Sequence, residues 1–269
     1  MTRYAEVIGD PIAQSKSPLI HGFWLDALGL EGSYRATRVE PDALAGYFDR
    51  RCDDPDWCGC NITIPHKVAA LDHVADPGGV RASIGAINTV FRGEGGVLTG
   101  TNTDAGGFYA PLAGVDLADK PVVVIGAGGA ARAILFALAR LNVGPVTLIA
   151  RSPLKGAALL AMFGLKGSVQ PIGAALPPAA LLVNASPLGM AGQPPLAIDL
   201  APLGDDAIVY DIVYAPLQTG LLAAADARGL ATIDGLEMLV GQAAFAFEIL
   251  FDAAPPRDRD DELRALLTQ

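Results

Sequence analysis

Residues 121–133 read PVVVIGAGGAARA, and this stretch decides the fold. Val122 to Ile125 form a continuous β-branched run, which is typical of a short buried strand. The turn from Gly126 to Ala131 has the pattern G-x-G-x-x-A, and apolar residues at helical spacing follow it. A strand, a glycine-rich turn and a helix in this order predict the first element of a Rossmann-like dinucleotide-binding domain.

Each position of this turn meets a physical requirement. Gly126 permits the tight turn, Gly128 lets the backbone approach a pyrophosphate, and Ala131 keeps the helix close to the sheet. The first turn of the helix then offers free N–H groups to phosphate oxygens. The alternative is a glycine-rich loop that only packs a helix on a strand. The predicted cofactor-binding residues of this loop are Gly126, Ala127, Gly128, Gly129 and Ala130.

The next predicted strand, residues 146–150, ends in a cation and favours the cofactor interpretation. Arg151 stands where an acidic residue would accept a hydrogen bond from a ribose 2′-hydroxyl, and Ser152 and Lys155 follow it. A guanidinium at this point pairs with a 2′-phosphate, which favours NADP(H) over NAD. The alternative for Arg151 and Lys155 is a solvated surface pair. We predict that Arg151, Ser152 and Lys155 bind the cofactor.

Short apolar runs alternate with helical patterns along most of the remaining chain. This alternation predicts an α/β fold with mainly parallel strands. A boundary near residues 105–120 divides the chain about evenly, and the polar tail 255–261 is expected to be exposed. Strands are predicted near 5–8, 33–39, 60–64, 146–150, 181–184, 208–212 and 231–233, helices over 18–28, 43–51, 131–141 and 236–251, and a hairpin over 87–103.

Composition narrows the class of protein. The chain has 269 residues, of which 51% are hydrophobic and 18% charged, and this excludes a disordered chain. The formal net charge is −10 without a basic run, so we expect no nucleic-acid partner and no membrane partner. No apolar run reaches the roughly 18 residues of a membrane span, and Glu6 and Asp10 lie where a secretory signal would be apolar. We therefore expect a cytoplasmic protein.

The three cysteines, Cys52, Cys58 and Cys60, carry little chemistry. Their odd number argues against a disulfide framework, and they form no CxxC pair that would indicate zinc. We expect structural or incidental cysteines and no metal site.

Two serines lie in the polar string GDPIAQSKSP at residues 9–18, which joins a predicted strand to a predicted helix. Hydroxyl groups at this place usually cap the helix, so capping is one interpretation of Ser15 and Ser17. Two hydroxyls beside free N–H groups also suit a bound carboxylate. The residue types leave both interpretations open.

A second polar string, GCNITIPHK, ends at Lys67. Asn61 and Thr63 alternate with apolar residues, so we expect them on one face of a strand. Lys67 follows at the carboxyl end of that strand, where α/β proteins bind ligands, although an isolated lysine is usually a surface residue. His66 and His21 are expected to pack or to lie on the surface rather than to catalyse.

Two further strings, GAINT at 85–89 and GTNTD at 100–104, place Asn88 and Asp104 at opposite ends of a hairpin-like element. Such residues also form plain turns. A lysine, an aspartate and several amides and hydroxyls suit a polyhydroxylated substrate. Together with a redox-cofactor domain they indicate alcohol oxidation by hydride transfer.

In combination these strings resemble the shikimate dehydrogenase family, which includes shikimate/quinate dehydrogenases. The matching pieces are GDPIAQSKSPLIH at 9–21, NITIPHK at 61–67, IGAINT at 84–89, GTNTD at 100–104, GAGGAARA at 126–133, ARSPLK at 150–155, NASPLGM at 184–190, YDIVYAPLQTGLL at 210–222 and DGLEMLVGQAAFAFEILF at 234–251.

The resemblance implies two α/β domains separated by a cleft. The N-terminal substrate-binding domain, with a mainly parallel sheet, would span residues 1–105 and be completed by a C-terminal helix at about 236–269. The Rossmann-like NADP-binding domain would span residues 106–235. The implied reaction is the NADP-dependent reversible reduction of 3-dehydroshikimate to shikimate in aromatic amino acid biosynthesis, carried out by a monomer or homodimer.

The resemblance also implies roles for individual residues. Lys67 and Asp104 match the catalytic pair. Ala150 stands where the family often has Asn, which removes a possible contact near the adenosine ribose. Substrate contacts are implied for Ser15, Ser17, Asn61, Thr63, Asn88, Tyr214 and Gln242, and positions near the nicotinamide for Ile212 and Gly235.

Three alternatives stay open beside this expectation. A quinate/shikimate dehydrogenase that uses NAD would carry an acid in place of Arg151. A non-catalytic shikimate sensor on the same scaffold would have lost Lys67 or Asp104, and both are present. A two-domain dehydrogenase of the methylenetetrahydrofolate type fits poorly with the string that contains Ser15 and Ser17.

Overall fold

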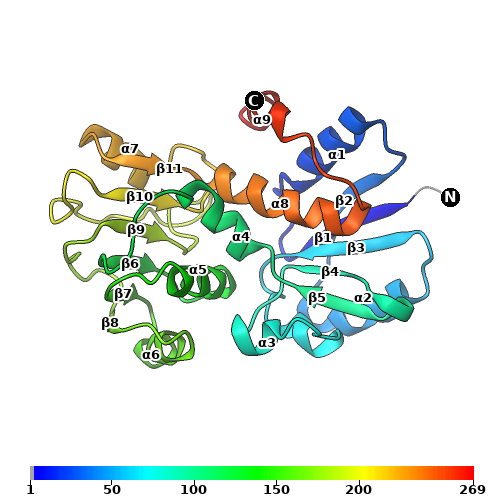
Figure 1. The fold of residues 1–269 in the computed structure, drawn as a ribbon, viewed down its shortest axis with the longest axis horizontal. Helices are drawn as coiled ribbons and strands as arrows, with labels where there is room; N and C mark the ends of the chain where they lie inside the picture. The colour runs from blue at the N-terminus through cyan, green and yellow to red at the C-terminus, as the bar shows by residue number, and fades with distance from the viewer. Residues whose placement is uncertain (1–2) are drawn as a thin grey trace. The chain divides into compact units, whose positions relative to one another are not determined.

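The chain forms two compact units in the computed structural model, which describes residues 3–269 (Figure 1). Unit 1 comprises the described part of Met1–Thr103 together with Val240–Gln269, and unit 2 is Asp104–Leu239. The boundaries at 105 and 236 expected from the sequence differ slightly. The reason is that Asp104 already begins helix α4 (Asp104–Tyr109), and that helix α8 (Gly235–Phe251) starts in unit 2 and continues into unit 1.

Unit 1 contains a five-stranded sheet of order β2-β1-β3-β4-β5. Strand β1 runs parallel to β2 and β3, whereas β4 runs antiparallel to β3 and β5. Helices α1 and α2 provide the crossovers that parallel neighbours require, and a glycine turn at 93–96 closes the β4–β5 hairpin. The elements are β1 (Tyr4–Gly9), α1 (Ser17–Leu28), β2 (Ser33–Arg38), α2 (Leu44–Cys52), β3 (Trp57–Ile62), α3 (Val80–Ser83), β4 (Thr89–Arg92) and β5 (Leu98–Thr101).

An aromatic cluster forms part of the core of unit 1. The rings of His21 on α1 and Tyr34 on β2 stack with centroids 3.9 Å apart, and Trp24 meets Phe247 of α8 edge to face at 5.4 Å. Helix α8 also passes close to β3, because a Cβ on Gly59 would lie only 2.4 Å from the Leu250 side chain. The C-terminal part of α8 is thereby built into the core of unit 1.

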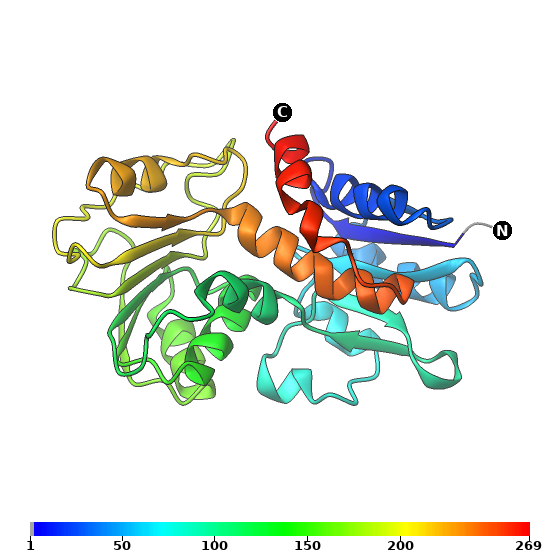
Figure 2. The same ribbon diagram turned by 45° about the horizontal axis from the view of Figure 1, so that its top comes forward.

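The prediction of an exposed tail over 255–261 is wrong at Pro255, whereas Arg257, Asp258 and Asp261 are exposed as expected. Pro255 is buried, and Asp260 begins helix α9 (Asp260–Leu267), which lies beside α1 (Figures 1 and 2). Leu263 and Leu267 of α9 are buried, and the Lys16 ammonium group donates a hydrogen bond to the Leu267 carbonyl. The sequence pattern hides this helix because only two of its eight residues face the core.

Unit 2 contains a six-stranded parallel sheet of order β11-β10-β9-β6-β7-β8. The order reverses at β6, so its carboxyl end and that of the neighbouring β9 form a switch point, where open α/β sheets bind ligands. The elements are β6 (Val122–Ile125), α5 (Gly129–Arg140), β7 (Val146–Ile149), α6 (Pro153–Met162), β8 (Gly167–Gln170), β9 (Leu181–Asn184), β10 (Ile208–Asp211), α7 (Gly220–Ala227) and β11 (Ala231–Ile233).

Two hydrophobic layers cover the two faces of this sheet. Val122 and Val124 point into one layer, which contains α5 and α6, and Val123 and Ile125 point into the other, which contains α7. This explains why the strand is apolar at every position rather than at alternate positions. Edge strand β8 was not predicted, because its sequence GSVQ has no apolar run.

Candidate functional site

The glycine turn after β6 lies against the turn after β9. Ile125 and Asn184 are register partners at the carboxyl ends of these parallel strands, and the Ala185 N–H donates to the Ile125 carbonyl. Gly126 has a φ of +116°, and a Cβ there would lie 2.6 Å from the Ala185 oxygen. Only glycine satisfies both the left-handed backbone and this close approach. The first position of the G-x-G-x-x-A pattern is therefore fixed by the fold.

Gly128, the next glycine of the G-x-G-x-x-A pattern, faces open space. It is the N-cap residue of α5, no side chain caps the helix, and a Cβ on Gly128 would meet no atom within 4 Å. Ala131 is fully buried against the sheet. The turn from Gly126 to Ala130 thus leaves N–H groups of a 12-residue helix uncapped beside an open surface, an arrangement that suits a phosphate.

Exposed cations follow β7. Arg151, Ser152 and Lys155 are all exposed, so the two cations can reach a ligand from solvent. The Ser152 hydroxyl caps α6 by accepting a hydrogen bond from the Lys155 N–H at 3.4 Å, and its own O–H group can still donate. Ala150 is buried, and its N–H donates to the Gln170 carbonyl of the neighbouring β8. This corner of unit 2 offers positive charge to an anionic group.

The segment after β10 is held close to the start of α8. A Cβ on Gly235 would lie 2.5 Å from the carbonyl oxygens of Ile212 and Val213, so the fold requires glycine there. Ile212 itself donates its N–H to the Asn184 carbonyl at 3.1 Å. Tyr214, two residues further on, is half-buried, and burial raises the pKa of its phenol. Ile212, Tyr214 and Gly235 therefore belong to one ordered edge of unit 2.

In unit 1 the amide of Asn61 is occupied by protein partners. Its Oδ1 accepts a hydrogen bond from the Tyr34 hydroxyl at 2.6 Å, and its Nδ2 donates to the Asn88 carbonyl at 3.2 Å and to Thr89 Oγ1 at 3.0 Å. Asn61 is buried. Its contacts join β2, β3 and β4 and fix the backbone that carries Asn88.

Asn88 lies at the centre of a second group of buried hydrogen bonds. Its Nδ2 donates to Thr103 Oγ1 at 2.8 Å and to Gln242 Oε1 at 3.2 Å, and its Oδ1 accepts from the Thr103 N–H at 2.7 Å. The structure therefore brings together two residues predicted from the sequence, Asn88 and Gln242, that are 154 positions apart. Thr103 was missed, although it directly precedes Asp104 in the quoted string GTNTD.

Thr63, Lys67 and Asp104 lie beyond the ends of regular strands. Thr63 follows β3 by one residue, and its methyl group approaches Gly9 so closely that a Cβ there would lie 2.6 Å away. Lys67 is half-buried, and its carbonyl accepts a hydrogen bond from the Ile87 N–H at 2.8 Å. Asp104 is buried as the first residue of α4.

Neither serine is the N-cap residue of α1. The N-cap residue is Lys16, whose side chain makes no capping hydrogen bond. Ser15 Oγ accepts a long hydrogen bond of 3.3 Å from the Ser17 N–H, and Ser17 is buried as the first helical residue. The capping interpretation is therefore wrong for Ser17. The local geometry of Ser15 satisfies one free N–H group of the helix start.

His66 and His21, the two histidines considered as candidates, have structural contacts. His66 is buried with its Nε2 2.7 Å from the Val39 carbonyl, and His21 is buried in the aromatic cluster. Within residues 3–269 no group of three or more histidine, cysteine, aspartate or glutamate residues could hold a metal ion. In the same range no helix has both the length and the apolar character needed to cross a bilayer.

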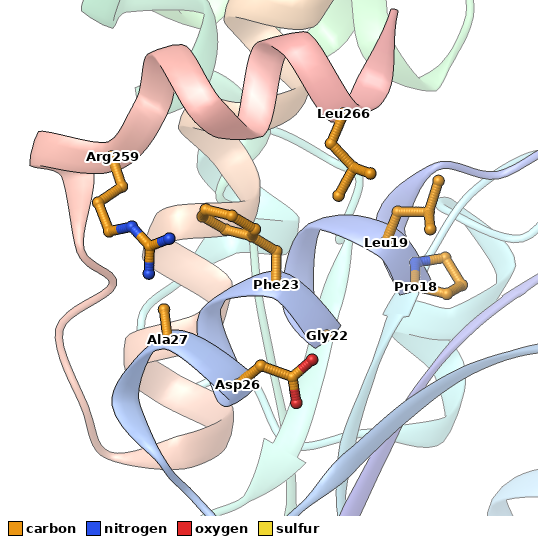
Figure 3. A pocket seen from close by; sticks show the side chains of 8 residues that line it. All are labelled: Pro18, Leu19, Gly22, Phe23, Asp26, Ala27, Arg259 and Leu266. Atoms are coloured by element: carbon orange, nitrogen blue, oxygen red, sulfur yellow. The ribbon is translucent and has the colours of Figure 1, made fainter. Parts of the chain in front are cut away.

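A hollow of about 390 Å³ lies between α1 and α9 and contains none of the predicted site residues (Figure 3). The Arg259 guanidinium lies over the Phe23 ring at 5.0 Å, and Leu266 faces α1. The residues that line this hollow are mostly apolar: Pro18, Leu19, Gly22, Phe23, Asp26, Ala27, Arg259 and Leu266.

Two segments of the chain, one near each end, match models of known protein families. Residues 7–90 match the shikimate dehydrogenase substrate binding domain, and residues 235–260 match the shikimate 5′-dehydrogenase C-terminal domain. The chain is 68% identical over 264 residues to the shikimate dehydrogenase (NADP(+)) of Sphingopyxis alaskensis. The aligned region covers 98% of this chain and 96% of that enzyme. It is 47% identical to the enzyme of the same name from Methylobacterium radiotolerans, with 94% and 93% covered.

Solved structures agree with these relatives. Shikimate 5-dehydrogenase from Thermus thermophilus, in complex with NADP(H) and shikimate, is 38% identical with a TM-score of 0.86, covering 99% of this chain and 100% of that one. Quinate dehydrogenase from Corynebacterium glutamicum, in complex with NAD, is 28% identical with a TM-score of 0.84, covering 98% and 99%. The fold, the near-complete coverage and the high identity together show that this chain belongs to the shikimate dehydrogenase family.

Proposed function

We propose that this protein is an oxidoreductase that catalyses the NADP-dependent, reversible reduction of 3-dehydroshikimate to shikimate. The observation that carries the proposal is the 68% identity, over 98% of the chain, with a relative named shikimate dehydrogenase (NADP(+)). The proposal includes a cytoplasmic location and a monomer or homodimer as the working form. Unit 1 binds the substrate and unit 2 binds the cofactor.

The cofactor side of the proposal is supported by the turn after β6 and by the cations after β7. The uncapped start of α5 receives the pyrophosphate. Arg151 and Lys155 pair with the 2′-phosphate, which NAD lacks, and a guanidinium binds phosphate through two parallel hydrogen bonds. Ile212 and Gly235 lie beside the nicotinamide in this proposal.

The substrate side is supported by the polar groups of unit 1. In this proposal Ser15 and Ser17 bind the substrate carboxylate, and Thr63, Asn88 and Gln242 bind its hydroxyls. The family resemblance assigns a carboxylate contact to Tyr214 of unit 2 as well. Asn61 supports Asn88 from behind, because its amide is already used by Tyr34, Thr89 and the Asn88 carbonyl. A buried, hydrogen-bonded amide holds a neighbouring group in one orientation, which lowers the entropic cost of binding.

Lys67 and Asp104 form the proposed catalytic pair. The bound cofactor supplies or accepts the hydride at the reacting carbon. In the reductive direction the Lys67 ammonium group donates a hydrogen bond to the carbonyl oxygen, and this bond strengthens as the oxygen gains negative charge. Lys67 then passes one proton to this oxygen and completes the alcohol, whose O–H group donates a hydrogen bond to the Asp104 carboxylate. Both side chains therefore act at the atom whose charge changes during the reaction.

A steady-state assay tests the proposed function. Shikimate and quinate are each offered with NADP⁺ and with NAD⁺, and kcat/KM is measured for all four combinations. We expect the highest value for shikimate with NADP⁺. The highest value for quinate with NAD⁺ would replace the proposal with the quinate/shikimate dehydrogenase alternative. No turnover with tight binding of shikimate would support the sensor alternative.

Replacement of Lys67 tests the chemistry separately from binding. We expect Lys67→Ala to lower kcat on the order of 100-fold or more with little change in KM, since the lost interaction belongs mainly to the transition state. Arg151→Ala serves as the matched change on the cofactor side. It should raise KM for NADPH while leaving KM for NADH nearly unchanged. A Lys67 variant within a few-fold of the wild-type kcat would remove Lys67 from the chemistry.

A further inference from the structure

Asp211 is a fully buried carboxylate at the end of β10. Its Oδ1 accepts hydrogen bonds from Asn184 Nδ2 at 2.9 Å and from the Val213 N–H at 3.0 Å. Its Oδ2 accepts one from the Thr219 hydroxyl at 2.7 Å. These partners tie the end of β10 to the end of β9 and to the start of α7.

All three partners of Asp211 are neutral. Among residues 3–269, no lysine, arginine or histidine forms an ion pair with this carboxylate. Buried charges are normally paired, because removal of an ion from water is costly. All three partners direct N–H or O–H groups at the two oxygens, which suits the ionised form of the acid. A neutral residue would fill this place at lower cost, so the retained charge calls for a reason.

The position of Asp211 in the sheet gives a reason for its buried charge. Asp211 is the register partner of Asn184, which is the register partner of Ile125 immediately before the glycine turn. The next residue, Ile212, has its carbonyl oxygen against Gly235. The buried carboxylate therefore lies directly beneath the edge of unit 2 that faces the nicotinamide in the proposed function.

We infer that the buried charge of Asp211 biases the redox state of the bound cofactor, because it stabilises the cationic nicotinamide of NADP⁺ relative to the neutral ring of NADPH. This inference rests on the proposed function and deepens it. Asp211 acts through space and through the segment that it holds, so it is a positioning residue and does not touch the reacting atoms.

The physical basis is the difference in charge between the two forms of the cofactor. NADP⁺ and NADPH share the phosphates and the adenosine and differ in charge at the nicotinamide ring. A fixed negative charge close to that ring, within protein, changes the relative affinity of the two forms by roughly tenfold. The same bias lowers the reduction potential of the bound couple and favours hydride donation to the ketone.

The test compares the dissociation constants of NADP⁺ and NADPH for the wild-type protein and for Asp211→Asn. Asparagine keeps the shape of the side chain and removes its charge. We expect the ratio Kd(NADP⁺)/Kd(NADPH) to rise roughly tenfold in the variant. The affinity for 2′-phospho-ADP-ribose, which lacks nicotinamide, should stay within twofold. An unchanged ratio, or an equal loss of affinity for all three ligands, would overturn the inference.

Three further variants separate charge from structure. Asp206→Asn removes an exposed charge just before the amino end of the same strand and should leave the ratio unchanged. Asp211→Glu keeps the charge and disturbs the packing, so it should lower kcat without a rise in the ratio. If Asp211→Asn fails to fold, Asp211→Ser carries the same prediction, because it is also neutral.

The design distinguishes two kinds of failure. A wild-type protein that neither binds NADP(H) nor oxidises shikimate contradicts the proposed function itself. A wild-type protein that does both, with an unchanged ratio in the neutral variants, contradicts only the role of Asp211.

Discussion

Each unit buries an acidic residue completely at a strand, and the two residues have opposite surroundings. Glu6, in β1 of unit 1, accepts hydrogen bonds from Arg51 at 2.7 Å and from Arg35 at 3.0 Å. It also accepts from the hydroxyls of Thr37 and Tyr47. Asp211 of unit 2 has only neutral donors.

The two surroundings move the two pKa values in opposite directions. Burial alone would raise the pKa of Glu6, but the hydrogen bonds from Arg51, Thr37, Tyr47 and Arg35 lower it to about 2. Burial prevails at Asp211, whose pKa is raised despite its hydrogen bonds. A buried carboxylate with its own cations stabilises the fold, whereas one without them projects its charge onto its neighbourhood. Because both side chains are fully buried, the difference between their pKa values comes from their partners.

Removal of the charge on Glu6 should have the largest effect on stability. Glu6→Gln leaves Arg51, whose side chain is only 17% exposed, without its counter-charge, and we expect a loss of about 3 kcal/mol in the free energy of unfolding. Urea unfolding at pH 7 measures this loss. The ratio of the NADP⁺ and NADPH dissociation constants should not change. The control Arg35→Met, at a side chain that is 55% exposed, should cost less than about 1 kcal/mol.

A second prediction concerns how the stabilisation by Glu6 changes at acidic pH. Because Glu6 has a lowered pKa in the folded state, its stabilisation is present above pH 4.5 and is lost as the pH falls from 4.5 towards 2. The difference in unfolding free energy between wild type and Glu6→Gln should therefore shrink over this window. A difference that stays constant down to pH 3 would mean that the ion pairs do not control the ionisation of Glu6.

His21 extends the comparison to a buried base without a polar partner. Within the described part of the chain both of its ring nitrogens lack a hydrogen bond, and burial lowers its pKa from 6.5 to about 3. The unfolded chain therefore binds the proton more readily, and stability is lost as the pH falls below 6.5. We expect about 2 kcal/mol of this loss between pH 6.5 and pH 5.

His21→Phe should abolish that loss, since phenylalanine keeps the stacking on Tyr34 and does not titrate. Thermal unfolding of both proteins at pH 8, 6.5 and 5 checks the prediction. Parallel pH dependences of the two proteins would show that His21 is not the group responsible.

Removal of the hydrogen-bond donor to a neutral buried acceptor should have the smallest effect on stability. Tyr34→Phe removes the donor to Asn61 Oδ1 and leaves that oxygen buried, at a cost of about 1 kcal/mol. We also expect KM for shikimate to rise a few-fold with kcat nearly unchanged, because Asn61 supports the backbone of Asn88. Tyr109→Phe, at an exposed tyrosine, is the control. A normal KM in Tyr34→Phe would remove Asn61 from substrate positioning.

Elements with a strong local signal could be predicted from the sequence. The strand over 122–125, its glycine turn and the α/β class follow from apolar runs and glycine spacing within a short window. Strand β8 and helix α9 were missed, because an edge strand and a short terminal helix bury too few side chains to leave a periodic pattern. These two elements form because they pack against the rest of the fold, and their own sequences give little sign of them.

Candidate site residues could be predicted only as residue types on separate strings. Asn88 was named from the string GAINT, and Gln242 only through the family resemblance, but no local pattern indicates that they share a hydrogen bond. Thr103 and Asp211 were missed because their importance lies in their partners. Threonine and aspartate are common in turns, and only the fold shows that these two are buried.

The chain crosses from one unit to the other twice, at Thr103–Asp104 and at Leu239–Val240. In sequence, unit 2 is therefore a continuous insertion between the two segments of unit 1. The two cut ends of unit 1 are held together, since Asn88 hydrogen-bonds both Thr103 and Gln242. A short linker from Thr103 to Val240 would therefore close unit 1 on itself after excision of the insert, and we expect each half to fold when produced alone.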